Sequence, residues 1–378
     1  MEFKKEHGQY FTKDISLQNK VYEFVKNNPK VILEPSCGAG HLVNNYPNKK
    51  TNFDCYELDE TIDFLIDIKT ITFGDFLKQE IKKKYKTIIG NPPYVKTSKG
   101  NLYIDFIDIC VDLLKKEGEL VFIIPSDFLK LTSAIKTINK MLDNGHFTDI
   151  YHPHDEHLFE NATVDIIVFR YVKTKNKDNK IQYNDKEMYI NANNGIITFS
   201  DNEFTNSKLI SDLFNVYVGM VTGREKIYKN EDLGNFKMLN GEDKIDNYIF
   251  IKEYPSNDDK INKYLEDNKE QLMKRKIRKF NEDNWFEWGA PRNISKIEDN
   301  FDKKCIYVKN LTRNEKVAFK GNVNYFSGGL IMLLPKKEDI NLDEITDYLN
   351  TEEFKQNYTY ANRFKIGQKQ LLNGIINI

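Results

Sequence analysis

A chain of 378 residues, of which 40% are hydrophobic and 30% charged, can bury a sizeable core and is long for a single domain. Its 56 basic and 57 acidic residues give a net charge of -1, so a nucleic-acid-binding function would require the positive charge to be gathered on one face. The four cysteines form no C-x-x-C pair, and no stretch approaches the roughly 20 apolar residues of a membrane helix. We therefore expect a soluble, cytoplasmic protein with two domains and with neither a zinc ribbon nor disulfides.

Strand-like and helix-like patterns alternate through the first half of the chain. The apolar spacing from residue 101 onward indicates a helix that ends at Gly118, and the near-continuous apolar run after it indicates a strand covered on both faces. This alternation predicts an α/β domain with a mostly parallel sheet. The expected strands are 30–35, 51–59, 70–76, 85–93, 119–125, 147–153 and 162–172, and the expected helices are 41–46, 101–118 and 133–145.

The polar stretch "KTKNKDNK" (173–180) is typical of a linker or an exposed turn. Three short strand patterns follow it, and the region beyond them has turns and aromatic residues without a strand–helix–strand rhythm. We place a domain boundary between about residues 173 and 210. The chain is accordingly divided into a catalytic domain (1–200) and a smaller mixed α/β domain (201–378).

A glycine-rich turn, "LEPSCGAGHL" (33–42), connects the first strand to the first helix. Gly38 and Gly40 would let the backbone approach a ligand closely, but the turn contains neither a complete G-x-G-x-x-G nor a P-loop. Glu57 ends the next strand about 20 residues later, where an acidic side chain can accept from ribose hydroxyls. A ligand-free turn and a solvated acidic residue explain these two features equally well.

The next strand ends in "TFGDF" (72–76), where Asp75 could accept from the exocyclic amine of an adenine and Phe76 could lie against its ring. A Gly-Asp pair is common in ordinary turns, so this stretch alone favours no ligand.

The most specific stretch is Asn91-Pro92-Pro93-Tyr94, which follows an apolar strand and a glycine. The lone pair of an adenine N6 amine is delocalised into the ring, and acceptors on both amine hydrogens would make it available for reaction. The Asn91 side-chain oxygen and the Pro92 carbonyl could supply these acceptors, and Tyr94 offers a flat face for stacking. The two prolines fix the backbone that holds them. This stretch predicts methylation of a planar amine, and a rigid turn is the simpler alternative.

A base must leave the duplex to reach such a pocket, where a second ring would be useful. Phe159, just before the last strand of the domain, is our candidate for this ring, although it could equally be a buried core residue.

Taken together and in order, several motifs resemble the amino-methylating DNA methyltransferases. The N-terminal position of "GQYFT" is similar to the gamma class, the TaqI-like enzymes that make N6-methyladenine. The resemblance extends more weakly to 216–228 and 284–293, which look like the target recognition domain of that group. The matching stretches are "HGQYFT" (7–12), "LEPSCGAG" (33–40), "YELD" (56–59), "GDF" (74–76), "NPPY" (91–94) and "IIPSDFL" (123–129).

This resemblance implies a site-specific, adenine-specific DNA methyltransferase with a Rossmann-like, mostly parallel seven-stranded sheet and S-adenosyl-L-methionine as cofactor. It places Thr12 and the turn 34–38 at the methionine part, Glu57 at the ribose, and Asp75 with Phe76 at the adenine. Asn91, Pro92, Tyr94 and Phe159 would carry catalysis. The implied cofactor residues are Tyr10, Thr12, Glu34, Ser36, Cys37, Gly38, Glu57, Leu58, Asp75, Phe76, Asn91 and Pro93.

The cysteines argue against a different methylation chemistry. Carbon-5 methylation of cytosine requires a Pro-Cys nucleophile, and the chain has no such dipeptide. In the motif "EPSCGAG", Ser36 and Cys37 replace other small residues of many methyltransferases, so Cys37 could line the pocket, but we assign it no nucleophilic role.

The second half of the chain holds the expected contacts with double-stranded DNA. "QLMKRKIRKF" (271–280) is rich in basic residues and lies near two tryptophans, a combination that suits phosphate contact and stacking. A solvated helix face is the alternative. The residues that we expect at the DNA are Arg224, Lys274, Arg275, Lys276, Trp288, Arg292, Lys309 and Arg313.

Several alternatives remain at this point. "HPHDEH" (152–157) matches no standard metal site and is better explained as a loop at the rim of the active site. NPPY also occurs in methyltransferases that act on RNA or on a protein glutamine, but the long C-terminal region favours DNA. A DNA-binding module with a degenerate cofactor fold is a third, non-enzymatic hypothesis. We expect a monomer that acts alone or beside a cognate restriction endonuclease, without a stable complex between them.

Overall fold

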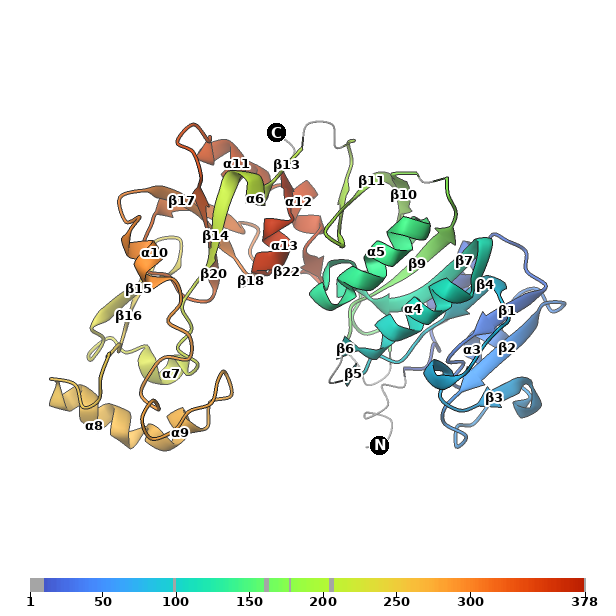
Figure 1. The fold of residues 1–378 in the computed structure, drawn as a ribbon, viewed down its shortest axis with the longest axis horizontal. Helices are drawn as coiled ribbons and strands as arrows, with labels where there is room; N and C mark the ends of the chain where they lie inside the picture. Colours follow the sequence, from blue (N-terminus) through green and yellow to red (C-terminus); the bar gives the residue numbers. More distant parts are fainter. Residues whose placement is uncertain (1–9, 98–99, 160–162, 177, 204–206, 377–378) are drawn as a thin grey trace. The chain divides into compact units, whose positions relative to one another are not determined.

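The structure is a computed structural model that describes residues 10–97, 100–159, 163–176, 178–203 and 207–376 (Figure 1). The chain divides into two compact units. The first comprises residues up to 205 together with 360–362, and the second comprises the remainder from residue 206. Within the described residues, no helix is both long enough and apolar enough to span a membrane.

The first unit is built on a sheet with ten described strands. Seven of these strands follow one another in the order β3-β2-β1-β4-β7-β9-β8: the first five are parallel, and β9 runs antiparallel between β7 and β8. The predicted α/β fold class is confirmed by this mostly parallel seven-stranded arrangement. In order across the sheet, the strands are β12 (Ile196–Ser200), β11 (Lys186–Asn193), β10 (Lys180–Tyr183), β8 (His146–Tyr151), β9 (Ile166–Lys173), β7 (Leu114–Pro125), β4 (Tyr85–Gly90), β1 (Val31–Glu34), β2 (Asn52–Glu57) and β3 (Ile71–Phe73).

Strands β10 to β12 extend the expected sheet on one side. Strand β10 pairs in parallel with β8, and β11 and β12 continue as an antiparallel meander. Of the two interpretations of 173–180, the structure supports the exposed turn and not the linker, because this stretch connects β9 to β10 of one sheet and its described residues between 175 and 179 are exposed.

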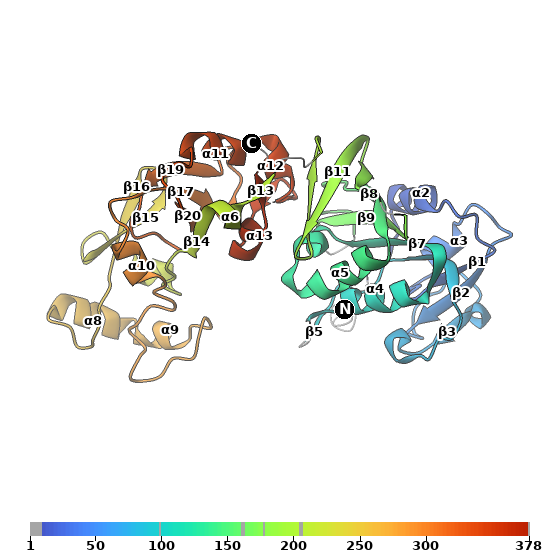
Figure 2. The same ribbon diagram turned by 45° about the horizontal axis from the view of Figure 1, so that its top comes forward.

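Two sets of helices cover the two faces of this sheet. Helices α4 (Leu102–Leu113) and α5 (Ile135–Asn144) lie over one face, and α2 (Ile15–Phe24) and α3 (His41–Asn44) lie on the other (Figures 1 and 2). Successive residues of β7 alternate between the two cores, as the pleat of a strand requires. The short 3₁₀ helices are η1 (Ile68–Thr70), η2 (Phe76–Lys78), η3 (Ser126–Lys130) and η4 (Thr132–Ala134).

Helix α4 ends earlier than predicted. The pattern indicated a helix up to Gly118, but the helix ends at Leu113, and Leu114 already pairs with Tyr85 of β4. The periodicity could not reveal this end, because the residues that follow Leu114 up to Gly118 are charged and fit either element.

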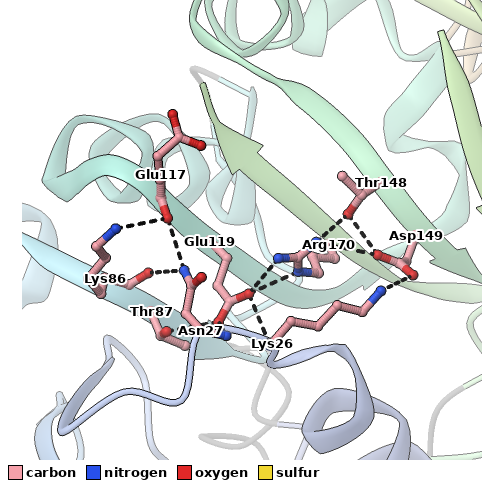
Figure 3. A network of polar contacts seen from close by, with 9 residues as sticks. All are labelled: Lys26, Asn27, Lys86, Thr87, Glu117, Glu119, Thr148, Asp149 and Arg170. Carbon is pink, nitrogen blue, oxygen red and sulfur yellow. Dashed lines mark hydrogen bonds and ion pairs between the residues drawn. The ribbon is translucent and has the colours of Figure 1, made fainter. Parts of the chain in front are cut away.

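A charged network lies at the amino ends of the parallel strands (Figure 3). The fully buried Glu119 carboxylate pairs with Arg170 at 2.9 Å and accepts from the backbone nitrogens of Lys26 (3.1 Å) and Asn27 (2.9 Å). The Thr87 hydroxyl donates to it as well, at 2.9 Å. These bonds tie the connection between α2 and β1 to three strands of the sheet.

The second unit has a central antiparallel sheet in the order β14-β20-β17-β19. One apolar core gathers around the buried Trp285 and Trp288, and another packs under the C-terminal helices. Its strands are β13 (Lys208–Leu209), β14 (Phe214–Val218), β15 (Phe236–Gly241), β16 (Lys244–Tyr248), β17 (Lys304–Lys309), β18 (Leu311–Thr312), β19 (Ala318–Asn322), β20 (Leu330–Pro335), β21 (Thr359–Tyr360), β22 (Arg363–Lys365) and β23 (Ile375–Ile376). Its helices are α6 (Ile210–Leu213), α7 (Glu225–Tyr228), α8 (Asp259–Asp267), α9 (Lys269–Met273), α10 (Ile294–Glu298), α11 (Leu342–Leu349), α12 (Glu352–Gln356) and α13 (Gln368–Leu372).

Candidate active site

The predicted motifs meet at the carboxyl ends of the parallel strands. Strands β1 and β2 end at Glu34 and Glu57, and Asp75 and Asn91 follow β3 and β4. The chain crosses from one side of the sheet to the other between the neighbouring strands β1 and β4, and open α/β sheets bind their ligands at such a switch point.

A cavity of about 290 Å³ opens at this edge, next to a recess of about 20 Å³. Every predicted cofactor residue lines one of them. Those in the cavity are Tyr10, Ser36, Gly38, Glu57, Leu58, Asp75, Phe76, Asn91 and Pro93, and the recess adds Thr12, Glu34 and Cys37. The cavity wall also contains Leu77, Val95, Leu102 and Phe106, which the prediction missed because they are apolar residues outside every quoted motif. Four more lining residues lie within quoted motifs but were not among the individual cofactor residues: Phe11, Pro35, Asp59 and Gly74.

Glu57 is held in place by three backbone donors. Its Oε2 accepts from the Gly38 nitrogen at 2.7 Å, and its Oε1 accepts from the nitrogens of Leu58 (2.9 Å) and Asp59 (3.0 Å). An ionised carboxylate has about four lone-pair sites, so a site remains for a ligand hydroxyl. At Gly38, φ is +52° and an added Cβ would lie 2.9 Å from the Phe11 ring, so this close approach requires glycine.

The side chains at the end of β3 close the apolar part of the cavity. The Asp75 carboxylate accepts from the Leu77 nitrogen at 3.1 Å and pairs with Lys78 at 3.0 Å. Phe76 is buried and stacks on Phe106 with a 12° angle between the rings. This part of the cavity therefore has a carboxylate beside a rigid apolar wall.

The buried Glu34 and the half-buried Cys37 at the recess both have a raised pKa. Burial raises the pKa of Glu34 well above its usual range, with Cys55 and Glu57 nearby adding to the effect. A hydrogen bond with Cys55 and burial raise the pKa of Cys37, which makes its thiol a poor nucleophile. The Glu34 side chain also explains the glycine before the NPPY motif, because a Cβ at Gly90 would lie 2.8 Å from the Glu34 Oε1.

The Asn91 amide is oriented by the N-terminal segment. Its Nδ2 donates to the Tyr10 carbonyl at 2.8 Å and to the Thr12 hydroxyl at 3.1 Å. A backbone carbonyl accepts only, so this contact fixes which end of the amide is nitrogen. The Asn91 Oδ1 then accepts from the Tyr94 hydroxyl at 2.5 Å, and burial raises the pKa of that hydroxyl well above 10.

Three aromatic rings gather around the NPPY motif. Phe159 is buried, and its ring centroid lies 6.2 Å from that of Tyr94. The Tyr10 ring lies against both, at 5.4 Å from Tyr94 and 5.8 Å from Phe159. The structure thus brings together the two rings predicted to hold a base and adds a third, from a segment that the sequence linked only to the cofactor.

Two of the predicted DNA contacts are wrong. Trp288 is 2% exposed and donates from Nε1 to the Ile249 carbonyl, and Arg275 is 8% exposed. The Arg275 guanidinium donates to the backbone carbonyls of four residues, and Phe280 covers it at 3.8 Å. Both side chains stabilise the second unit from within, and residue type alone could not distinguish this from surface exposure. The four carbonyls belong to Leu272, Thr222, Glu287 and Trp285.

The other predicted DNA contacts lie at or near the surface. Lys276, Arg292 and Arg313 are exposed, and Lys309 is half-buried with its Nζ donating to the Lys316 carbonyl. Two further exposed side chains have partners nearby: Arg224 donates to Gln271 at 3.1 Å, and Lys274 pairs with Glu270.

The three histidines of 152–157 do not gather at one point: the rings of His152 and His154 are in contact, with 3.7 Å between their centroids, and His157 pairs with Glu156. His152 is buried, whereas His157 is exposed. In the part of the chain that the structure describes, no three histidine, cysteine or acidic side chains are grouped as a metal site would require.

This fold and cavity resemble those of class I S-adenosyl-L-methionine-dependent methyltransferases. The residues present fit that cofactor: Glu57 and Asp75 offer acceptors for hydroxyl and amine groups, and Phe76 offers an apolar wall. Gly38 removes the side chain that would block approach to the turn.

Comparison with known proteins narrows this class. Residues 12–159 match the family model described as Eco57I restriction-modification methylase, which confirms the resemblance seen in the motifs. The type II methyltransferase M.HincII of Haemophilus influenzae is 30% identical over 198 residues, covering 46% of this chain and 38% of that protein. The chain thus spans less than half the length of this curated relative.

Two further similarities are to a ribosomal RNA methyltransferase and to a restriction-modification enzyme solved in complex with DNA. The ribosomal RNA small subunit methyltransferase A of Mesomycoplasma hyopneumoniae (strain J / ATCC 25934 / NCTC 10110) is 38% identical over 103 residues, covering 25% of this chain and 40% of that protein. Among solved structures, the type IIL restriction-modification enzyme MmeI in complex with DNA aligns with 95% of this chain and 63% of that one. The TM-score is 0.58 at 10% identity, so this likeness concerns the fold alone.

Proposed function

We propose that the protein transfers a methyl group from S-adenosyl-L-methionine to the N6 amine of an adenine flipped out of duplex DNA. The observation that carries this proposal is the Asn91 amide, whose nitrogen is held by Tyr10 and Thr12 so that its oxygen faces the Tyr94 hydroxyl beside the cavity. An amine hydrogen of a bound base could take the place of this hydroxyl hydrogen.

The residues of this chain would activate the amine by position. Asn91 Oδ1 and the Pro92 carbonyl would each accept a hydrogen bond from the amine. These two hydrogen bonds would reduce the delocalisation of the nitrogen lone pair into the adenine ring and so make it available for reaction. When bound, the cofactor would supply the methyl group, with the electron pair of the carbon–sulfur bond going to sulfur, and the methylated amine would lose one proton to solvent. The buried Tyr94 hydroxyl stays protonated and cannot serve as a strong base, because its pKa is raised by burial. Catalysis would rest on the orientation of the amine.

The aromatic cluster would receive the base. Tyr94 and Phe159 are placed to contact a planar ring, and Tyr10, which now lies against both, would have to yield space to it. Stacking of this kind compensates part of the cost of taking a base from the duplex, a few kcal/mol. Arg224, Lys274, Lys276, Arg292, Lys309 and Arg313 are our proposed contacts with the DNA.

Long-read sequencing of DNA from cells that express the protein, in a host without adenine methylation, tests this function. We expect N6-methyladenine at one short sequence, and we expect none with Asn91→Ala, which removes the amide acceptor. An Asn144→Ala variant, which changes an exposed amide at the end of α5 that bonds to the Lys140 carbonyl, serves as the matched control. Methylation by wild type that persists in Asn91→Ala would contradict the mechanism.

RNA is the second candidate substrate, because the similarity to ribosomal RNA methyltransferases covers 103 residues. The same purified protein, given tritiated cofactor with duplex DNA or with ribosomal RNA, separates the two. Label in the RNA without label in DNA of any sequence would overturn the choice of DNA.

A further inference from the structure

The loop between β8 and β9 carries Phe159, and its two ends are tied together. His152 begins this loop and Asp165 ends it, and both side chains are buried. The His152 Nε2 lies 2.8 Å from the Asp165 Oδ2. Closer to Phe159, the Val164 nitrogen donates to the Glu156 carbonyl at 3.1 Å.

The Asp165 end of this pair is anchored to β7 by Ser126. The Ser126 hydroxyl donates to the Asp165 Oδ2, and the Ser126 backbone nitrogen donates to the Asp165 carbonyl at 3.0 Å. Burial opposes ionisation of Asp165, but the hydrogen bonds from His152 and Ser126 outweigh it and lower the pKa of the carboxyl. An ionised carboxylate accepts only, so the His152 Nε2 carries the hydrogen.

The His152 end is anchored to β10 and to the turn after it. The Tyr183 hydroxyl lies 2.8 Å from the His152 Nδ1, and it donates there if the ring is neutral. Asn184 brackets the His152 backbone: its Oδ1 accepts from the His152 nitrogen at 2.7 Å and its Nδ2 donates to the His152 carbonyl at 3.1 Å. The strand pair that extends the sheet therefore supports the active-site loop.

This cluster is not a nucleophilic triad. The serine and the histidine both bond to the same oxygen of Asp165, whereas a triad requires the histidine between the serine and the carboxylate. His154 stacks on His152 with 3.7 Å between ring centroids and adds to the packing. These contacts instead hold the two ends of the loop between β8 and β9 in place.

We propose that the His152–Asp165 pair is a latch that positions Phe159 against the flipped adenine, which makes both residues positioning residues for methyl transfer. This inference rests on the proposed function. A stacking ring must be held within roughly 0.5 Å of its productive place, and displacement by about 1 Å can cost about 10²-fold in rate. Tying the ends of the loop limits the positions that the ring can adopt.

Asp165→Ala opens the latch, and Asp165→Asn restores an acceptor for the His152 Nε2. With DNA containing the methylated sequence found for wild type, we expect kcat to fall roughly 10- to 100-fold in Asp165→Ala, with cofactor affinity unchanged. Asp165→Asn should recover most of this loss. His157→Ala, in the same loop but with an exposed side chain, is the matched control. Equal kcat values for Asp165→Ala and wild type would overturn the proposal.

A double-mutant cycle shows whether the effect passes through Phe159. If it does, Asp165→Ala has little further effect on kcat in a Phe159→Ala background. If Asp165 and Phe159 act independently, the free-energy effects of the two substitutions on kcat add up in the double variant, and this result would overturn the proposal. Duplexes with 2-aminopurine at the target adenine add a spectroscopic signature. We expect Asp165→Ala to raise the fluorescence of the flipped base, because a loosened Phe159 stacks on it less.

Amide hydrogen exchange tests the latch without any substrate. We expect faster exchange at His152 and Val164 in Asp165→Ala, with the amides of β4 and β7 unchanged. Unchanged exchange in the loop would overturn the latch whatever the enzyme methylates. Wild type that methylates no DNA would instead overturn the proposed function, and with it the role of the latch toward adenine.

Discussion

The two edges of the first unit's sheet use polar groups in opposite ways. At the amino edge, the Glu119 carboxylate is completely enclosed and bonds to Arg170, to two backbone nitrogens and to Thr87 (Figure 3). At the carboxyl edge, Glu57 is also held by backbone donors, but it faces a cavity of about 290 Å³. The same residue type thus stabilises the fold at one edge and is our proposed ligand contact at the other.

The two edges differ in whether the carboxylate has a hydrogen-bond acceptor site that the protein does not use. A buried carboxylate with all its sites used by the protein cannot bind a ligand, and removing its partner leaves an unpaired charge. A carboxylate with one open site at a cavity can accept from a ligand while its fixed bonds keep it in place. The amino edge should therefore respond to substitution in stability, and the carboxyl edge in binding and rate.

The largest expected effect is at the amino edge. Glu119→Gln keeps the volume of the side chain but leaves Arg170 with Asp149, at 3.7 Å, as its counter-charge. It also puts an amide NH₂ among donors, so we expect a cost of about 3 kcal/mol in the free energy of unfolding, at the lower end for a broken buried pair. Chemical denaturation followed by circular dichroism measures this cost. Glu117→Gln is the matched control, because only the backbone carbonyl of Glu117 takes part in the network. A loss of cofactor affinity without a loss of stability would break the contrast between the two edges.

An intermediate effect is expected at the carboxyl edge. Glu57→Gln removes the charge that holds the turn at Gly38 and that faces the cavity, so we expect about 10- to 100-fold weaker binding of S-adenosyl-L-methionine, as for loss of a hydrogen bond to a charged group of roughly 1.5–3 kcal/mol. Isothermal titration calorimetry measures this affinity, and Glu60→Gln, an exposed neighbour, is the control. The free energy of unfolding should change much less than in Glu119→Gln, and a larger change would contradict the comparison.

The carboxyl edge was easier to predict from the sequence than the amino edge, because its residues belong to local motifs. The end of a strand, a glycine turn and the NPPY motif can each be recognised within a few residues, and parallel pairing brings them together. Glu119 and Arg170 lie 51 residues apart with no motif around either, so the ion pair became visible only in the folded chain. Tyr10 could likewise be connected with the cofactor turn, but not with Phe159, because that contact depends on how two distant loops pack.

The second unit shows where residue type misleads. Arg275 and Lys276 are adjacent in a basic stretch, and both were predicted to contact DNA. Arg275 is 8% exposed and is bonded to four backbone carbonyls, whereas Lys276 is exposed. Which of two neighbouring cations points inward depends on carbonyls supplied by three separate segments, and a helical or basic pattern carries no information about them.

The smallest predicted effect is that of Lys276→Ala. Together with Arg275, Lys276 extends to the second unit the contrast between a charge bonded within the protein and a charge exposed to a ligand. Lys276→Ala should leave the free energy of unfolding unchanged and weaken DNA binding about equally for all sequences, because it removes one phosphate contact. The slope of log K against log salt concentration should then become about one unit shallower. Fluorescence anisotropy with labelled duplexes at several salt concentrations measures this slope. Arg275→Ala is the matched variant, and it should lower the melting temperature. For the Arg275→Ala protein that remains folded, the slope of log K against log salt concentration should equal the wild-type slope. If Lys276→Ala leaves the slope unchanged and Arg275→Ala alone reduces it, the exposed side of this stretch does not contact DNA.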